Sequence, residues 1–350
     1  MLGHLMPSTP NLDTISEEKL LELPIKDLPV QIEGTWLEKC VNELHKELKD
    51  RGLLFKPKCY LADEWLTPDL EPVVGIPFFL AHPALIKLEK KMMVEAEGST
   101  VEWCMKLLRH EAGHAINYAF NLYKRRKWRE VFGSFKTEYK DIYRFRPYSR
   151  NFVRHLEDYY AQYHPDEDFA ETFAVWLTPK SDWKERYKKW PAIHKLNYID
   201  QVMDSIKNKE PAVKKGEQHW KVSRVRKTLK NYYKHKRHFH AEDFPDFHDT
   251  NLKKIFTIKE DEKDKGLPAA SKTIRKYRKY ILESTGNWTG EKKYIANDLI
   301  NKLIKRSTDL KLVCEENEAV TMLRVATYVS ALLMNYLYTG RFRGEKWRKK

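Results

Sequence analysis

The feature that most constrains the fold is a pair of histidines, His110 and His114, inside the segment with the clearest helical pattern, residues 100–128. Ser99 or Thr100 can cap the start of this helix. Residues four apart lie on one helix face, so both imidazoles can present a nitrogen to a single metal ion. The alternative is a helix that carries two histidines on a polar face. The segment therefore predicts a helix and raises a metal site as a hypothesis.

Glu111 adds a candidate catalytic residue to this hypothetical metal site, because it completes the pattern His-Glu-x-x-His at residues 110–114. On a helix of 3.6 residues per turn, Glu111 is rotated by about 100° from His110. It would therefore reach a water on the metal instead of the metal itself, and act as the general base. Catalytic zinc takes three protein ligands plus water, so the chain has to supply a third ligand.

A second predicted helix, residues 165–177, carries the candidates for that ligand. Pro165 suits its first turn. Glu167 and Glu171 lie four apart on one face, where like charges weaken an isolated helix by a few tenths of a kcal/mol. Apolar neighbours such as Phe169 predict that the helix packs in the core. Buried carboxylates need a partner, which a metal ion and a ligand histidine would supply.

The two motifs together, HEAGH at 110–114 and EDFAETFA at 167–174, resemble the gluzincin division of zinc metallopeptidases. They are more closely similar to a bacterial family of zinc-binding metallopeptidases, and the second motif is similar to the corresponding helix of anthrax lethal factor. This resemblance implies an α+β fold, one Zn²⁺ per chain, and hydrolysis of peptide bonds in a peptide or protein substrate.

The resemblance also implies roles for individual residues. His110, His114 and Glu167 would be the zinc ligands, Glu111 the general base, and Glu171 the acid that orients a ligand histidine. The insertion between the two motifs is longer than in the thermolysin type. Glu167, Asp168 and Glu171 therefore all stay open as the direct ligand, with Glu167 favoured.

Further candidates precede the second motif. By similarity to lethal factor, Tyr160 would donate a hydrogen bond to the developing oxyanion, and the alternative is that it is a packing residue. A basic block at 121–154 includes Arg144, Arg146 and Arg150. These arginines can clamp an anionic group of the substrate, such as a carboxylate, or lie in a solvated loop.

The charge of the chain is strongly asymmetric. Residues 1–200 hold 30 Lys+Arg against 31 Asp+Glu, whereas residues 201–350 hold 35 against 19. The excess favours either an anionic partner for residues 201–350 or basic helix faces that keep this part of the chain soluble. An alternative function is therefore a nucleic-acid- or anion-binding protein in which the zincin fold is a scaffold. Zinc-dependent hydrolysis of a non-peptide amide is a third possibility.

The expected organisation has three parts. A proline-rich arm (1–35) precedes a zincin-like metallopeptidase domain (36–200), in which segments 53–62 and 73–81 form a small mixed sheet beside the active-site helices. A basic, mainly helical region (201–350) follows.

The cellular location is predicted from apolar stretches, cysteines and the start of the sequence. The most apolar stretch, 325–338, is too short to span a bilayer and predicts a buried helix. Scattered cysteines and a start without a signal-peptide pattern favour a cytoplasmic protein.

Overall fold

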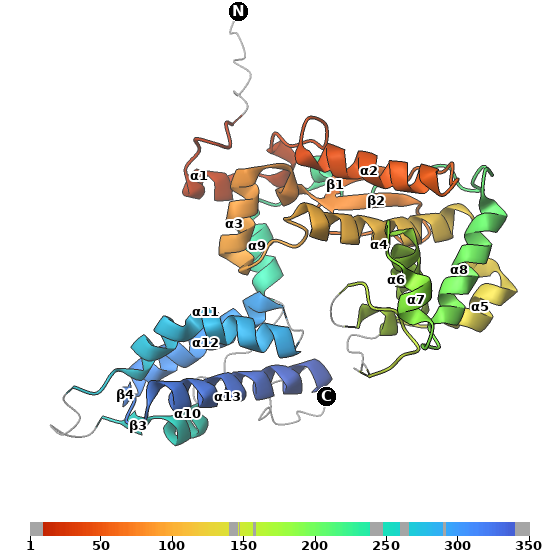
Figure 1. Ribbon diagram of the computed structural model, residues 1–350. Coiled ribbons are helices and arrows are strands. Elements are labelled where there is room, and N and C mark those ends of the chain that lie inside the picture. Colours follow the sequence, from red (N-terminus) through yellow and green to blue (C-terminus); the bar gives the residue numbers. More distant parts are fainter. Residues whose placement is uncertain are drawn as a thin grey trace, which may run out of the picture. The chain divides into compact units, whose positions relative to one another are not determined.

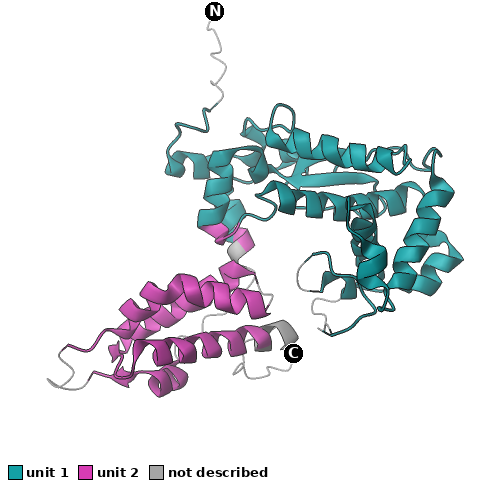
Figure 2. Ribbon diagram, in the orientation of Figure 1, with its two compact units in different colours: residues 1–91, 96–234 teal, residues 92–95, 235–350 magenta. Residues whose placement is uncertain are grey.

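The computed structural model describes residues 10–139, 146, 148–156, 159–238, 248–259, 266–289 and 292–339. The chain separates into two compact units (Figure 2). Unit 1 comprises residues 1–91 and 96–234, and unit 2 comprises residues 92–95 and 235–350.

Unit 1 combines helices with a small sheet, which confirms the predicted α+β class. Its elements, some of which continue a few residues past the unit's limits, are α1 (Glu17–Glu22), α2 (Trp36–Asp50), β1 (Lys58–Ala62), β2 (Val73–Pro77), α3 (Pro83–Met93), α4 (Val101–Ala119), α5 (Arg126–Phe132), α6 (Pro165–Leu177), α7 (Trp183–Tyr187), α8 (Ile193–Ile206) and α9 (Leu229–His238).

The sheet is shorter than the sequence predicts. Strands β1 and β2 pair in parallel, and an isolated antiparallel bridge joins Leu66 to Gly75. β1 begins only after Pro57, which lacks a backbone N–H for the ladder. β2 ends at Pro77, and the apolar residues that follow form a 3₁₀ helix, Phe78–Ala81. Both prolines therefore limit the sheet to its central residues.

Helix α4 packs against both strand β2 and helix α2 (Figure 1). The hydroxyl of Thr35 accepts a hydrogen bond from the Leu37 N–H and caps α2, as expected for a threonine before an amphipathic helix. Arg109 of α4 donates to both carboxylate oxygens of Glu47 on α2, at 2.6 and 2.8 Å. This buried, bidentate pair fixes α4 against α2 immediately before His110.

The prediction of a helix over 100–128 is wrong about where the helix ends. α4 stops at Ala119 because the chain turns at Asn121, whose φ of 51° is left-handed. A 3₁₀ turn and α5 then follow. Asparagine tolerates this conformation better than most residues, and the helical periodicity of the sequence does not reveal it.

Helix α6 has the predicted bounds, with Pro165 in its first turn. The His164 ring nitrogen Nδ1 accepts a hydrogen bond from the Asp166 N–H and caps the helix. α6 packs across α4 (Figure 1). The approach is close at Gly113, where a Cβ atom would lie 2.8 Å from Ala170 Cα. Glycine at this position lets the two helices that carry the motifs come together.

Unit 2 is mainly helical. Its elements are α10 (Asp249–Ile255), β3 (Thr257–Ile258), α11 (Ala270–Thr289), α12 (Lys293–Asp309), β4 (Leu312–Val313) and α13 (Glu318–Thr339), with β3 and β4 antiparallel. Helices α11, α12 and α13 pack against one another. The apolar stretch 325–338 lies within α13, where Val325, Val329 and Leu333 are buried, in agreement with the expected buried helix. None of the helices in the described ranges has the length and apolar character needed to cross a membrane.

Candidate metal centre

Three buried side chains from α4 and α6 converge on one point. His110 Nε2 lies 3.2 Å from His114 Nε2, and Glu167 Oε2 lies 3.1 Å from the first nitrogen and 3.2 Å from the second. All three residues are at most 6% exposed. The cluster that the HExxH motif and Glu167 predict is therefore assembled by the fold, and it has the composition of a group able to hold a metal ion.

The geometry of this triangle fits a tetrahedral metal ion. Zinc with bonds of about 2.0–2.1 Å to nitrogen separates its ligand atoms by about 3.3 Å. Without a cation, two imidazole nitrogens and a carboxylate oxygen would face one another at this distance in a buried site. Two histidines and a glutamate are also a donor set that catalytic zinc uses.

The contacts of Nδ1, the ring nitrogen that faces away from the shared point, determine the tautomer of each histidine. His110 Nδ1 lies 2.9 Å from Glu171 Oε1, and His114 Nδ1 lies 2.8 Å from Asp166 Oδ2. An ionised carboxylate only accepts hydrogen bonds, so each Nδ1 carries the hydrogen. In a neutral ring, this leaves the lone pair of each Nε2 directed at the shared point. Such outer carboxylates fix both the tautomer and the orientation of a ligand histidine.

Glu171 lies where the resemblance implied an orienting acid. Its second carboxylate oxygen, Oε2, accepts a hydrogen bond from the Leu156 N–H at 3.0 Å. The carboxylate is thus held from two sides, by His110 and by the segment that precedes α6. It is 1% exposed, so these contacts replace water.

Asp166 was missed by the sequence reasoning. Its carboxylate accepts hydrogen bonds from Asn117 Nδ2 at 2.7 Å and from the Tyr118 hydroxyl at 2.5 Å, besides facing His114. Acidic residues are common in the first turn of any helix, so Asp166 carries no distinctive signal in the sequence.

Asp168 had been left open as a ligand, but it points elsewhere. Its Oδ2 lies 2.5 Å from Lys195 Nζ, in a buried ion pair with α8. Burial raises the pKa of Asp168 to about 7, although Lys195 opposes this shift. The residue is one position after Glu167 and therefore faces a different side of α6.

Glu111, the candidate base, is buried beside the cluster and 7% exposed. Burial raises the pKa of its carboxyl group, while His110 and His114 act in the opposite direction. The Thr67 hydroxyl donates to the Glu111 backbone carbonyl at 3.1 Å, which ties this turn of α4 to the loop between β1 and β2.

The charges in the cluster favour a positive charge at the point on which the three side chains converge. Burial by itself lowers the pKa of His110, but hydrogen bonds to Glu167 and Glu171 outweigh it and raise that pKa to about 9. Burial raises the pKa of Glu167, yet the two histidines together hold it well below its usual range. A cationic centre between these three groups is thus favoured by the charges around it.

Two tyrosines border the cluster. The Tyr160 ring centroid lies 5.6 Å from that of His110, and burial raises the pKa of its hydroxyl well above the usual value. The Tyr139 hydroxyl donates to Glu167 Oε1 at 3.1 Å, and its ring stacks on His164 at 3.9 Å. Tyr139 was also missed, because it belongs to a loop with no motif around it.

Among the residues that the structure describes, neither Arg146 nor Arg150 forms a side-chain contact with the cluster. Arg144 lies outside the described residues. Arg146 and Arg150 are exposed. The contacts described for them involve the backbone: the Arg146 N–H donates to Gln162, and the Arg150 carbonyl accepts from the Ala192 N–H.

Comparison with known protein families agrees with this site. Residues 93–210 match the family described as "Putative zinc-binding metallo-peptidase", the family that the two motifs resemble. The resemblance is therefore confirmed, and the matched segment contains both α4 and α6. Searches of curated proteins and of solved structures found no match.

Proposed function

We propose that the protein is a zinc-dependent peptidase of the gluzincin type, with His110, His114 and Glu167 as the ligands of one Zn²⁺. The observation that carries the proposal is the buried triangle of donor atoms with sides of 3.1–3.2 Å. The family match supports zinc-dependent peptidase chemistry. The gluzincin assignment rests on the third ligand, a glutamate from a second helix.

A zinc ion supplies Lewis acidity, which polarises a substrate carbonyl and makes water more acidic. Residues of the protein carry out the remaining steps. In our proposal the Glu111 carboxylate takes a proton from the attacking water and delivers it to the leaving amine. Its position suits this role, because Glu111 is buried next to the proposed ligand His110.

Tyr160 is proposed to donate a hydrogen bond from its hydroxyl to the oxyanion of the tetrahedral intermediate. Support comes from its position against the His110 ring and from a raised pKa, which keeps the hydroxyl protonated and able to donate. Tyr139 is assigned a different role, because its hydroxyl already donates to Glu167. It holds the ligand carboxylate in place.

We further propose that the substrate carries an anionic group recognised by Arg146 or Arg150. The support is one of position: the segment that contains Arg150 continues to Leu156, whose N–H holds Glu171 at the cluster. An exposed guanidinium a few residues from the site can meet a carboxylate on a bound peptide.

The test is hydrolysis of a peptide library by the zinc-loaded full chain, its Glu111→Gln variant and a control variant, Glu102→Gln. Glu102 is an exposed acid in the first turn of the same helix. We expect Glu111→Gln to keep its zinc and lose at least about 100-fold in rate, because general-base catalysis contributes about 10²–10⁴. Glu102→Gln should behave as wild type.

Two results would overturn this proposal. Full activity of zinc-bound Glu111→Gln would remove the assigned base. Failure of the zinc-loaded wild type to cleave any peptide would exclude peptidase activity and direct attention to non-peptide amides.

A further inference from the structure

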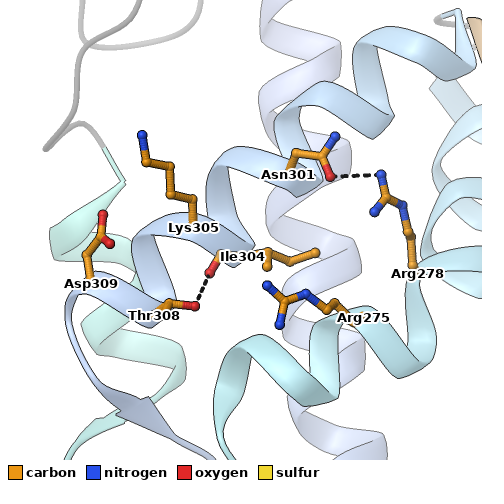
Figure 3. Close-up of a pocket in the computed structure, with 7 residues that line it drawn as sticks. All are labelled: Arg275, Arg278, Asn301, Ile304, Lys305, Thr308 and Asp309. Atoms are coloured by element: carbon orange, nitrogen blue, oxygen red, sulfur yellow. Dashed lines mark hydrogen bonds between the residues drawn. The ribbon is translucent and has the colours of Figure 1, made fainter. Parts of the chain in front are cut away.

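A cavity of about 320 Å³ lies in unit 2, between α11 and α12 (Figure 3). Arg275 and Arg278 reach it from α11, and Asn301, Lys305 and Thr308 line it from α12. Residues three or four apart share a helix face, so each helix turns one continuous side to the cavity. Three cationic residues thus line one cavity outside the metal centre.

Arg278 is held in position without losing its charge. Its guanidinium donates through Nε and Nη2 to Asn297 Oδ1, and through Nη2 to Asn301 Oδ1 at 2.8 Å (Figure 3). Both acceptors are neutral amides. An arginine oriented by a carboxylate would have its charge compensated, whereas this one keeps its full positive charge and has N–H groups to spare.

The other two cations are exposed, and within the described parts of the chain neither Arg275 nor Lys305 forms an ion pair. The one acidic residue at the cavity, Asp309, lies 3.7 Å from Arg306, which does not line it. Arg306 is itself paired with Asp249, so Asp309 offsets at most one of the three positive charges. The cavity as a whole keeps an excess of positive charge.

We propose that this cavity binds a phosphate group, either free phosphate or the phosphate of a small phosphorylated ligand. A single carboxylate would balance only one of the three cations. Phosphate carries between one and two negative charges near neutral pH and several acceptor oxygens. These oxygens match the Arg275 guanidinium, the N–H groups left on Arg278 and the Lys305 ammonium group. This inference does not depend on the metal centre or on the proposed peptidase activity.

The experiment is isothermal titration calorimetry on the full chain with inorganic phosphate, a nucleoside 5′-monophosphate and acetate, at one fixed ionic strength. We expect both phosphates to bind and acetate to bind at least tenfold more weakly. Equal affinities for the two phosphates would identify phosphate alone as the ligand. Tighter binding of the monophosphate would identify a phosphorylated ligand.

Variants locate the site. Arg275→Gln and Arg278→Gln should each weaken phosphate binding by about tenfold or more, since each removes charge-assisted hydrogen bonds. Lys254→Gln removes one exposed charge from the last turn of α10, outside the cavity, and should leave binding unchanged. Arg275 is exposed, so its variant is expected to fold normally, which circular dichroism checks.

The proposal is wrong if neither phosphate binds at millimolar concentration, or if acetate binds as tightly as phosphate. It is equally wrong if Arg275→Gln and Lys254→Gln weaken binding to the same extent, because the effect would then follow net charge instead of the cavity.

Discussion

The side chain of Asp166 faces His114 from the side opposite the proposed metal: its Oδ2 lies 2.8 Å from His114 Nδ1. The next residue in the chain, Glu167, places Oε2 3.2 Å from the Nε2 of the same ring. One turn of α6 therefore contacts both nitrogens of one histidine. The start of α6, which His164 caps, therefore positions both groups that contact the His114 ring.

Replacing the outer carboxylates should weaken zinc binding without removing a ligand. We expect Asp166→Asn and Glu171→Gln each to lower zinc affinity by about 10–100-fold, because an amide no longer enforces the tautomer that directs the Nε2 lone pair at the metal. Competition with a chelator of known affinity measures the change.

Asp168→Asn is the matched control for this prediction. It alters a buried carboxylate of the same helix that pairs with Lys195 instead of a histidine. We expect a lower thermal stability and an unchanged zinc affinity. Equal losses of zinc affinity in all three variants would show that α6 simply loses its structure, and would contradict specific roles for Asp166 and Glu171.

Kinetic measurements should distinguish the roles of Tyr160 and Tyr139. Tyr160→Phe is expected to lower kcat by about 100-fold with little change in zinc content, as for the loss of one oxyanion donor. Tyr139→Phe removes the hydrogen bond to Glu167, so it should weaken zinc binding by less than about tenfold and keep kcat at saturating zinc. Steady-state kinetics with zinc held in excess distinguishes the two, and the reverse pattern would exchange the assigned roles.

Gly113→Ala should destabilise unit 1. The added methyl group would lie 2.8 Å from Ala170 Cα and 3.1 Å from Ala170 O, which are backbone atoms that cannot rotate away. We expect a loss of about 1–3 kcal/mol in unfolding free energy together with weaker zinc binding.

Gly286→Ala in α11 is the control for Gly113→Ala, because a Cβ atom at residue 286 contacts only the Lys293 side chain, at 3.7 Å or more. That variant should gain about 0.5–1 kcal/mol, as for glycine replaced in a helix interior. Urea unfolding measures both variants. A stable, zinc-binding Gly113→Ala protein would contradict the close packing of α4 on α6.

The stability of unit 2 should fall as the pH falls from about 6.5 towards about 4. Burial, together with the charge of Lys302, lowers the pKa of His248 from 6.5 to about 4, against the smaller effect of Asp249. Above pH 6.5 the ring is neutral in both states. Below it the unfolded chain binds the proton first, so unfolding is favoured by up to about 3 kcal/mol.

Hydrogen exchange of α10 and α13 against pH measures this loss, since His248 Nδ1 lies 3.0 Å from the Tyr328 hydroxyl of α13. His248→Gln should make exchange in these helices less dependent on pH over this range. The exposed His235 offers a control, because His235→Gln should leave the dependence in place. An unchanged pH profile in His248→Gln would contradict the prediction.

The local structure near the motifs could be read from the sequence. The proline at the start of α6 and the apolar residues along it depend on neighbours within a few residues, and they predicted the bounds of α6. The end of α4 could not be predicted, because one residue in a left-handed conformation decides it. Pro57 and Pro77 shortened the strands for a similarly local reason that hydrophobic patterns do not register.

In the site, too, some residues could be predicted from local sequence patterns and others could not. His110, His114 and Glu167 follow from spacing on helices and from a family resemblance. Asp166 and Tyr139 matter only because α6 and the loop before it fold against α4, and nothing in their sequence context marks that contact. Residues that orient the ligands through tertiary contacts could therefore be identified only from the structure.

The most direct test of the central claim is the zinc content of the full chain, purified without added metal and measured by elemental mass spectrometry. His110→Ala and Glu167→Ala are measured alongside, with Glu102→Gln as the control. We predict about one zinc per chain in the wild type and the control, and a loss of zinc in both ligand variants. A wild-type chain that holds no zinc even after reconstitution, or a Glu167→Ala variant that holds it as tightly as the wild type, would contradict the account.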